Sequence, residues 1–217
     1  PPGDPPAQPM QALDDRLSNA WSVISHLNGV MNTDELRKVY KNCLEKLTEY
    51  STELSQNETL CAAYKKLAER PDFNELSEAQ RKSVENILRD FHLGGVDLPE
   101  AQKKQYAELS RELAELSNKY SDNVLDATQH WYKHITDIEQ LAGLPETAID
   151  GAKQVARQKD LDGYVITLDF PSFFPVMTYC DNRDLRREVY EAFVTRASDM
   201  GPDAGTWDNT PVMAEIL

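Results

Sequence analysis

The chain has 217 residues, and its 23 lysines and arginines face 37 aspartates and glutamates, which gives a formal charge of −14. This length suits one large domain or two small ones. So acidic a surface repels phosphate, which argues against nucleic acid and anionic membranes as partners. No apolar run approaches the length of a membrane span.

The first nine residues, PPGDPPAQP, are rich in proline. This composition is typical of a flexible segment or of a remnant of cloning, so residues 1–9 are predicted to be a leader outside the folded part.

Helical patterns dominate residues 10–130, which are predicted to form one helical domain. Residues 8–31 carry apolar side chains at helical spacing, at Leu13, Leu17, Trp21, Ile24 and Leu27. The helix that follows is expected to bury Leu36, Tyr40, Leu47, Leu54 and either Cys43 or Leu44.

Polar residues at the starts of helices mark the boundaries between them. Asn32 and Glu35 fit a capping box, and so do Ser77 and Gln80. Asn57 fits the N-cap of a shorter helix between these two.

Gly94 and Gly95 are expected to supply a left-handed helix end, after which the longest periodic segment begins. Its apolar positions alternate spacings of three and four residues, at Tyr106, Leu109, Leu113, Leu116, Tyr120 and Val124. This spacing fits a packed helix of a helical domain, and it also fits a coiled-coil seam.

Residues 131–217 have a different character. The segments 131–138 and 164–170 are rich in aromatic and β-branched residues and are predicted to be two strands, with a helix at 145–159 between them. Asp181 or Asn182 caps a further helix. The predicted fold class is therefore mainly α, with a small two-stranded β insert.

The last residues are predicted to begin a helix capped by Asn209 or Thr210, with Pro211 in its first turn. The sequence provides only one or two turns of this helix, and they include the apolar residues Val212 and Ile216. So short a helix is only marginally stable by itself. We expect the chain to be part of a longer protein and to self-associate weakly through exposed apolar surface.

One pair of histidines could bind a metal. His130 and His134 lie four residues apart in the sequence HWYKH, a spacing that places both on one face of a helix. However, Trp131 occupies the position of a zinc peptidase's general base, and in a strand the two histidines would lie about 13 Å apart. No metal site is predicted.

Other candidate groups have ordinary structural explanations. The isolated histidines, acidic pairs and basic cluster are interpreted as residues of helix surfaces or first turns: His26 and His92, Asp14 with Asp15, Asp181 with Asp184, and Arg183, Arg186 and Arg187. Cys43, Cys61 and Cys180 are an odd number without a C-x-x-C motif, which favours reduced thiols and a cytoplasmic protein.

Three segments are the most distinctive: SHLNGVMNTDELRKVY at 25–40, YSDNVLDAT at 120–128 and PVMTYCDNRDLRREVYEAFVTRASDMGP at 175–202. They resemble the oligopeptidase A / thimet oligopeptidase family of zinc metallopeptidases, and the resemblance extends from about Met10 to Leu217. It implies the multi-helix N-terminal half of a neurolysin-like, two-lobed peptidase, with residues 131–217 leading toward a catalytic half.

The resemblance also implies where the chemistry lies. In the family, the C-terminal half holds zinc through an H-E-x-x-H helix and a further acidic ligand, and that motif does not occur in this sequence. No catalytic or metal-ligating residue is therefore transferred to this chain, and its substrate-binding residues stay unknown. Zinc is expected only in the full-length enzyme.

Two functions fit these observations. In the first, the chain is the non-catalytic N-terminal portion of a cytosolic oligopeptidase, inactive alone, with one wall of a channel for short peptides and its own C-terminal half as partner. In the second, it is a stand-alone helical module that binds peptides or proteins.

Overall fold

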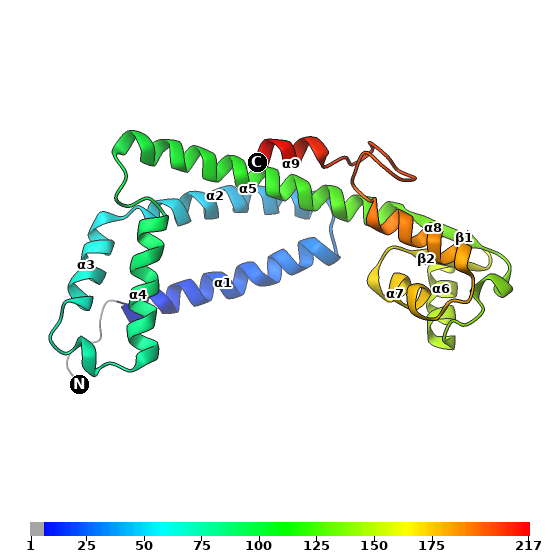
Figure 1. Cartoon of the computed structure of the whole chain (residues 1–217), viewed down its shortest axis with the longest axis horizontal. Coiled ribbons are helices and arrows are strands. Elements are labelled where there is room, and N and C mark those ends of the chain that lie inside the picture. The colour runs from blue at the N-terminus through cyan, green and yellow to red at the C-terminus, as the bar shows by residue number, and fades with distance from the viewer. Residues whose placement is uncertain (1–6) are drawn as a thin grey trace. The chain divides into compact units, whose positions relative to one another are not determined.

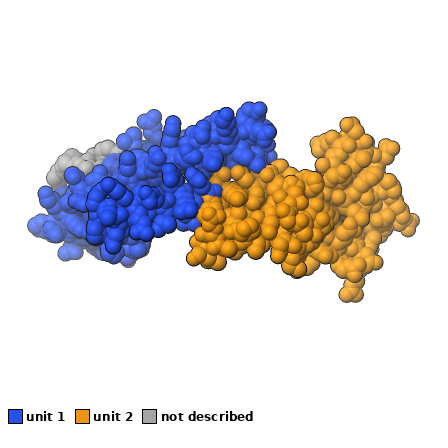
Figure 2. Space-filling view, turned by 90° about the horizontal axis from the view of Figure 1, so that it is seen from above, with its two compact units in different colours: residues 1–115 blue, residues 116–217 orange. Residues whose placement is uncertain are grey.

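The computed structural model describes residues 7–217, which are mainly helical with one small sheet (Figure 1). They form two compact units that divide between Glu115 and Leu116 (Figure 2). The predicted fold class, mainly α with a small two-stranded β insert, is confirmed. Most of the predicted leader at 1–9 lies outside the described residues, and the first helix begins at Ala7.

From residue 7 onward, the first unit contains four α-helices and the beginning of a fifth. They are α1 (Ala7–Val30), α2 (Asp34–Ser55), α3 (Glu58–Ala68), α4 (Glu78–Leu93) and the first half of α5 (Glu100–His130), with a short 3₁₀ turn at Phe73–Glu75 before α4. The helix α5 continues across the division between the units and ends at His130.

In the first unit, two of the three predicted N-caps are confirmed, and in the second unit Asn182 caps α8 as predicted. The side chain of Asn57 accepts a hydrogen bond from the Leu60 amide at 2.8 Å, and Ser77 forms a reciprocal capping box with Gln80. The capping box predicted at Asn32 is wrong, because Thr33 is the N-cap of α2. Asn32 instead donates to the Asn28 carbonyl, one turn earlier, which leaves the hydroxyl of Thr33 to cap the helix.

The end of α4 is a Schellman motif. Gly95 has a φ of +86°, and the amides of Gly95 and Val96 donate to the carbonyls of His92 and Phe91. Val96 and Phe91 are both buried, so the turn brings together two residues of the same core. Of the two glycines expected here, Gly95 is the left-handed one, whereas Gly94 has ordinary helical angles.

The core of the first unit lies between α3 and α4. It consists of Cys61, Tyr64, Val84, Phe91 and Val96, with the rings of Tyr64 and Phe91 6.0 Å apart. The long helices contribute much less. The α2 residues expected to be buried are only half-buried.

Much of the apolar surface of the long helices is exposed. Trp21 of α1 stacks on Tyr40 of α2 with ring centroids 4.7 Å apart, but Leu13 on the same predicted stripe of α1 is 60% exposed. Leu109 and Leu113 of α5 are also exposed, so its periodic pattern does not form a continuous packed seam.

The second unit is built around the small sheet. After α5 come β1 (Tyr132–Ile135), a 3₁₀ turn (Ile138–Leu141), α6 (Glu146–Gln158), β2 (Tyr164–Thr167), α7 (Phe170–Tyr179), α8 (Arg183–Val194) and α9 (Thr210–Ile216). The strands are antiparallel, with Tyr132 opposite Thr167 and Ile135 opposite Tyr164.

Both strands are shorter than predicted. The second ends at Thr167 because the segment from Phe170 onward forms α7, with a proline in its first turn. Residues from the strands and from α6, α7 and α8 meet in one core, which includes Ile135, Leu141, Ile166, Val176 and Val189.

The segment before α9 is attached to the second half of α5. The side chain of Asn209 is buried, donates to the Tyr120 carbonyl at 3.1 Å and accepts from the amide of Asn123 at 2.8 Å. Asn209 precedes α9 as predicted, but its side chain bonds α5 rather than capping the new helix. Val212 is buried, whereas Met213 and Ile216 are exposed.

Among residues 7–217, no helix combines the length and the hydrophobicity that crossing a bilayer requires.

Alanine at Gly94 and alanine at Gly151 should have opposite effects on stability, because Gly94 is in close contact with Ser55 and Gly151 is not in a crowded position. A Cβ at Gly94 would lie 2.5 Å from the Cβ of Ser55, whereas a Cβ at Gly151 in α6 has nothing within 4 Å. Gly94→Ala should therefore lower the free energy of unfolding by about 1–3 kcal/mol. Gly151→Ala should raise it by about 0.5–1 kcal/mol, because alanine favours a helix. Urea unfolding followed by circular dichroism measures both, and equal stability of the Gly94 variant and wild type would refute the contact.

The bonds of Asn209 predict an energetic coupling between α5 and the segment before α9. Asn209→Ala should cost about 1–3 kcal/mol, since it removes both hydrogen bonds that the buried Asn209 side chain makes to α5. Adding Asn123→Ala to that variant should cost much less than Asn123→Ala alone. A double-mutant cycle by urea unfolding tests this, and strictly additive losses would contradict the bond.

Candidate functional site

The two histidines considered as a metal pair are separated by the end of a helix. His130 is the last residue of α5, and its ring lies 4.9 Å from that of Trp207. His134 lies in β1, where its Nε2 is 2.5 Å from the carbonyl oxygen of Asp162. Each ring therefore has its own structural contact, and no group of three or more His, Cys, Asp or Glu capable of holding a metal occurs among residues 7–217.

The other polar candidates also have local contacts. His92 lies 2.9 Å from Asp97, and this hydrogen bond is the main cause that holds the pKa of Asp97 below its usual value. Asp184 lies 3.6 Å from Arg187 on the exposed side of α8, and Arg186 donates to the Cys180 carbonyl.

The three cysteines are free thiols, of which Cys61 and Cys180 are buried. Cys61 belongs to the core of the first unit and Cys180 to that of the second, so both are used as small apolar residues.

Arg196 is a half-buried cation. Its guanidinium lies 3.9 Å from the centre of the Phe193 ring, and burial lowers the pKa of Arg196. Its Nε is buried without a hydrogen-bond partner among the described residues. Because Phe193 also stacks on Phe173, at 3.9 Å between ring centroids, the guanidinium extends a stack of rings that joins α7 to α8.

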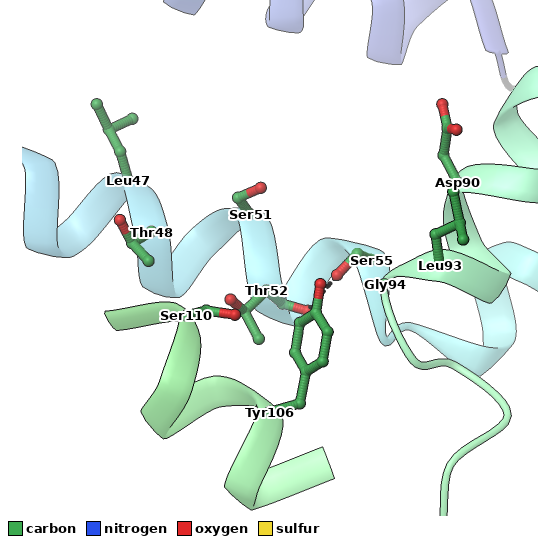
Figure 3. Close-up of a pocket in the computed structure, with 10 residues that line it drawn as sticks. All are labelled: Leu47, Thr48, Ser51, Thr52, Ser55, Asp90, Leu93, Gly94, Tyr106 and Ser110. Carbon is green, nitrogen blue, oxygen red and sulfur yellow. Dashed lines mark hydrogen bonds between the residues drawn. The ribbon is translucent and has the colours of Figure 1, made fainter. Parts of the chain in front are cut away.

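The most distinctive cavity lies in the first unit, between α2, the end of α4 and the beginning of α5 (Figure 3). We call it the hydroxyl groove, because six hydroxyl-bearing residues line its volume of about 460 Å³: Thr48, Ser51, Thr52, Ser55, Tyr106 and Ser110. Leu47, Leu93, Asp90 and Gly94 complete the lining. The volume is within the range of small-ligand pockets.

Two helices provide the hydroxyls. Those of α2 recur at positions 48, 51, 52 and 55, which is the spacing of one helix face, and Tyr106 and Ser110 lie one turn apart on α5. Figure 3 shows the Tyr106 side chain extending from α5 toward Ser55, at the end of α2. The end of α4 approaches α2 closely here because Gly94 has no side chain.

The groove is lined by hydroxyl groups together with apolar carbon atoms, and its lining carries no positive charge. Its one carboxylate, Asp90, accepts hydrogen bonds from the neighbouring Arg89 at 3.0 and 3.2 Å. Such a lining suits a neutral ligand with hydrogen-bonding groups and disfavours an anion.

Sequence reasoning left the substrate-binding residues unknown and did not identify this groove. A signal was present, since Thr48, Ser51, Thr52 and Ser55 place four hydroxyls on one face of a predicted helix. The pattern of α2 does not reveal which residues lie on the opposite side of the groove. These depend on how α5 returns beside α2 after the turn at Gly95.

Comparison with known proteins identifies the family. The profile of the neurolysin/thimet oligopeptidase N-terminal domain matches residues 6–103. Oligopeptidase A of Salmonella typhimurium is 52% identical over 210 residues, which are 97% of this chain and 31% of that protein. Oligopeptidase A of Escherichia coli is 51% identical over the same share of each chain.

More distant relatives match over the same region. The probable cytosolic oligopeptidase A of Arabidopsis thaliana is 37% identical over 217 residues, which are 97% of this chain and 30% of that protein. The chain thus spans about a third of the length of these relatives. The resemblance seen in the sequence is therefore confirmed: the chain belongs to the oligopeptidase A / thimet oligopeptidase family and contains that family's N-terminal domain.

Proposed function

We propose that this chain is the non-catalytic N-terminal portion of a zinc-dependent oligopeptidase that degrades short peptides, and that it forms one wall of the substrate channel. The observation that carries the proposal is the 52% identity to an oligopeptidase A over 97% of this chain but only 31% of that relative. The catalytic groups are assigned to the larger remainder, because the H-E-x-x-H motif that such chemistry uses does not occur in this sequence.

The residues in hand support a role in enclosing substrate. The polar residues considered as candidates from the sequence each interact with neighbouring groups, and they do not lie together in one site. The long helices instead offer extended surface, including the hydroxyl groove. In this proposal residues 10–130 are a helical domain, and residues 131–217 lead toward the catalytic half.

The partners and the location belong to the same proposal. Short peptides are the substrates, and the catalytic half of the same protein is the partner for exposed apolar residues such as Phe170 and Phe174, which stack on each other at 5.1 Å. Free thiols at all three cysteines fit a reducing cytoplasm, and one relative is named a probable cytosolic enzyme.

The proposal predicts that the chain alone does not hydrolyse peptides and does not retain stoichiometric zinc. A catalytic zinc site normally needs three protein ligands and an open position, and this chain lacks the family's ligand motif. The measurement is turnover of a quenched fluorescent peptide by the purified chain, with added zinc and with a chelator, together with the metal content after dialysis. Chelator-sensitive turnover that copurifies with the chain would refute the assignment of catalysis to the remainder.

A second prediction concerns the exposed face of α9. Met213 and Ile216 should mediate weak self-association, which should strengthen with salt because the charge of −14 opposes close approach. Sedimentation velocity at low and moderate salt measures it, and Ile216→Glu should reduce it. If the chain remains a monomer at high protein concentration and at both salt concentrations, the predicted self-association is wrong.

A further inference from the structure

The hydroxyl groove has a chemical character that neither catalysis nor folding accounts for. The hydroxyls of Thr48 and Ser55 donate to carbonyls of their own helix, at Leu44 and Thr52, so toward the groove they offer acceptor lone pairs. Those of Ser51, Thr52, Tyr106 and Ser110 have no hydrogen-bond partner within the described part of the chain, and each can both donate and accept. Both walls can therefore supply donors and acceptors.

The spacing of these hydroxyls resembles that of a peptide strand. Residues four apart on a helix are separated by about 6 Å along its axis, which is the spacing of Thr48 to Thr52 and of Tyr106 to Ser110. An extended peptide presents an N–H and a C=O toward the same side at every second residue, about 6.7 Å apart. The span from Thr48 to Ser55 is about 10.5 Å, which equals the length of about three extended residues.

Charge and shape favour a peptide main chain over other ligands. A phosphate or carboxylate would meet Asp90 and no cation in the lining. A polyol could use the same hydroxyls, but it would not require hydroxyls at strand spacing on two facing helices. Leu47 and Leu93 add apolar surface that side chains of a peptide can contact.

We propose that the hydroxyl groove binds the main chain of an extended peptide segment of about three residues, with little dependence on its side chains. This inference rests on the proposed function, since it assigns part of the recognition of short peptides to α2 and α5. The rows of α2 and α5 bind the two edges of the strand, and Tyr106 is the largest group that does so.

The test uses the whole 217-residue chain and acetyl-trialanine-amide, a neutral peptide without side-chain polar groups. Its binding, followed by NMR titration, should shift signals of residues around the groove. Tyr106→Phe and Ser110→Ala should each weaken binding by about two- to tenfold, as expected for one hydrogen bond. Tyr50→Phe, which removes a hydroxyl from an exposed part of α2 outside the groove, should leave affinity unchanged.

A second ligand separates main-chain recognition from simple contact. The same peptide methylated on its central nitrogen lacks one main-chain donor and should bind at least severalfold more weakly. Circular dichroism and thermal melts of each variant establish that it is folded like the wild type.

Several results would overturn the inference. They are equal binding of the methylated peptide, no effect of either groove variant in folded protein, tighter binding of a polyol such as sorbitol than of the peptide, or no detectable peptide binding at millimolar concentration. None of these would remove the proposed function, which is tested separately by activity in the presence of the catalytic portion.

Discussion

The end of α2 lies in close contact with the corner that joins α4 to α5, and this contact accompanies the return of α5 beside α2. Gly94 lets the Cβ of Ser55 approach closely, and Gly95 turns the chain so that α5 returns beside α2. Lys103 of α5 is nearly buried and holds Glu58, at the start of α3, at 2.5 Å. Lys103 is therefore the main cause that holds the pKa of Glu58 below its usual value.

The first unit contains long helices but only a small core. The buried residues of the first unit are concentrated between α3 and α4, whereas α2 has none. The corner fixes α2 against α5 at one end, and beyond it the two helices face each other across hydroxyls rather than across a packed apolar seam. The groove therefore lies where α2 and α5 do not pack against each other through apolar side chains.

The second unit has the opposite organisation. Its two short strands and the helices α6, α7 and α8 share one core of buried apolar residues. Its exposed aromatic residues, such as Phe170, Phe174 and Tyr190, lie on helices whose other side is packed in that core. These aromatic residues are therefore exposed apolar surface on a unit that has its own core.

Local signals in the sequence predicted much of this fold. Asn57, the Ser77–Gln80 box and the glycine pair mark boundaries that depend on nearby backbone groups, and the structure has each of them. The prediction failed where a choice depended on competing neighbours, as at Asn32, or on distant ones, as at Asn209, whose amide bonds α5. The groove was missed for the same reason, because Tyr106 and Ser51 are far apart in the sequence and meet only through the corner at Gly94.

The central claim is that this chain is one part of an oligopeptidase whose chemistry lies in the remainder. The most direct test combines the chain with the portion of Salmonella oligopeptidase A that remains after its matching N-terminal third is removed. The account predicts that the mixture forms a complex and hydrolyses a short fluorescent peptide in a chelator-sensitive manner, whereas neither part does so alone. Failure of this chain to restore activity, under conditions where the relative's own N-terminal third restores it, would contradict the account.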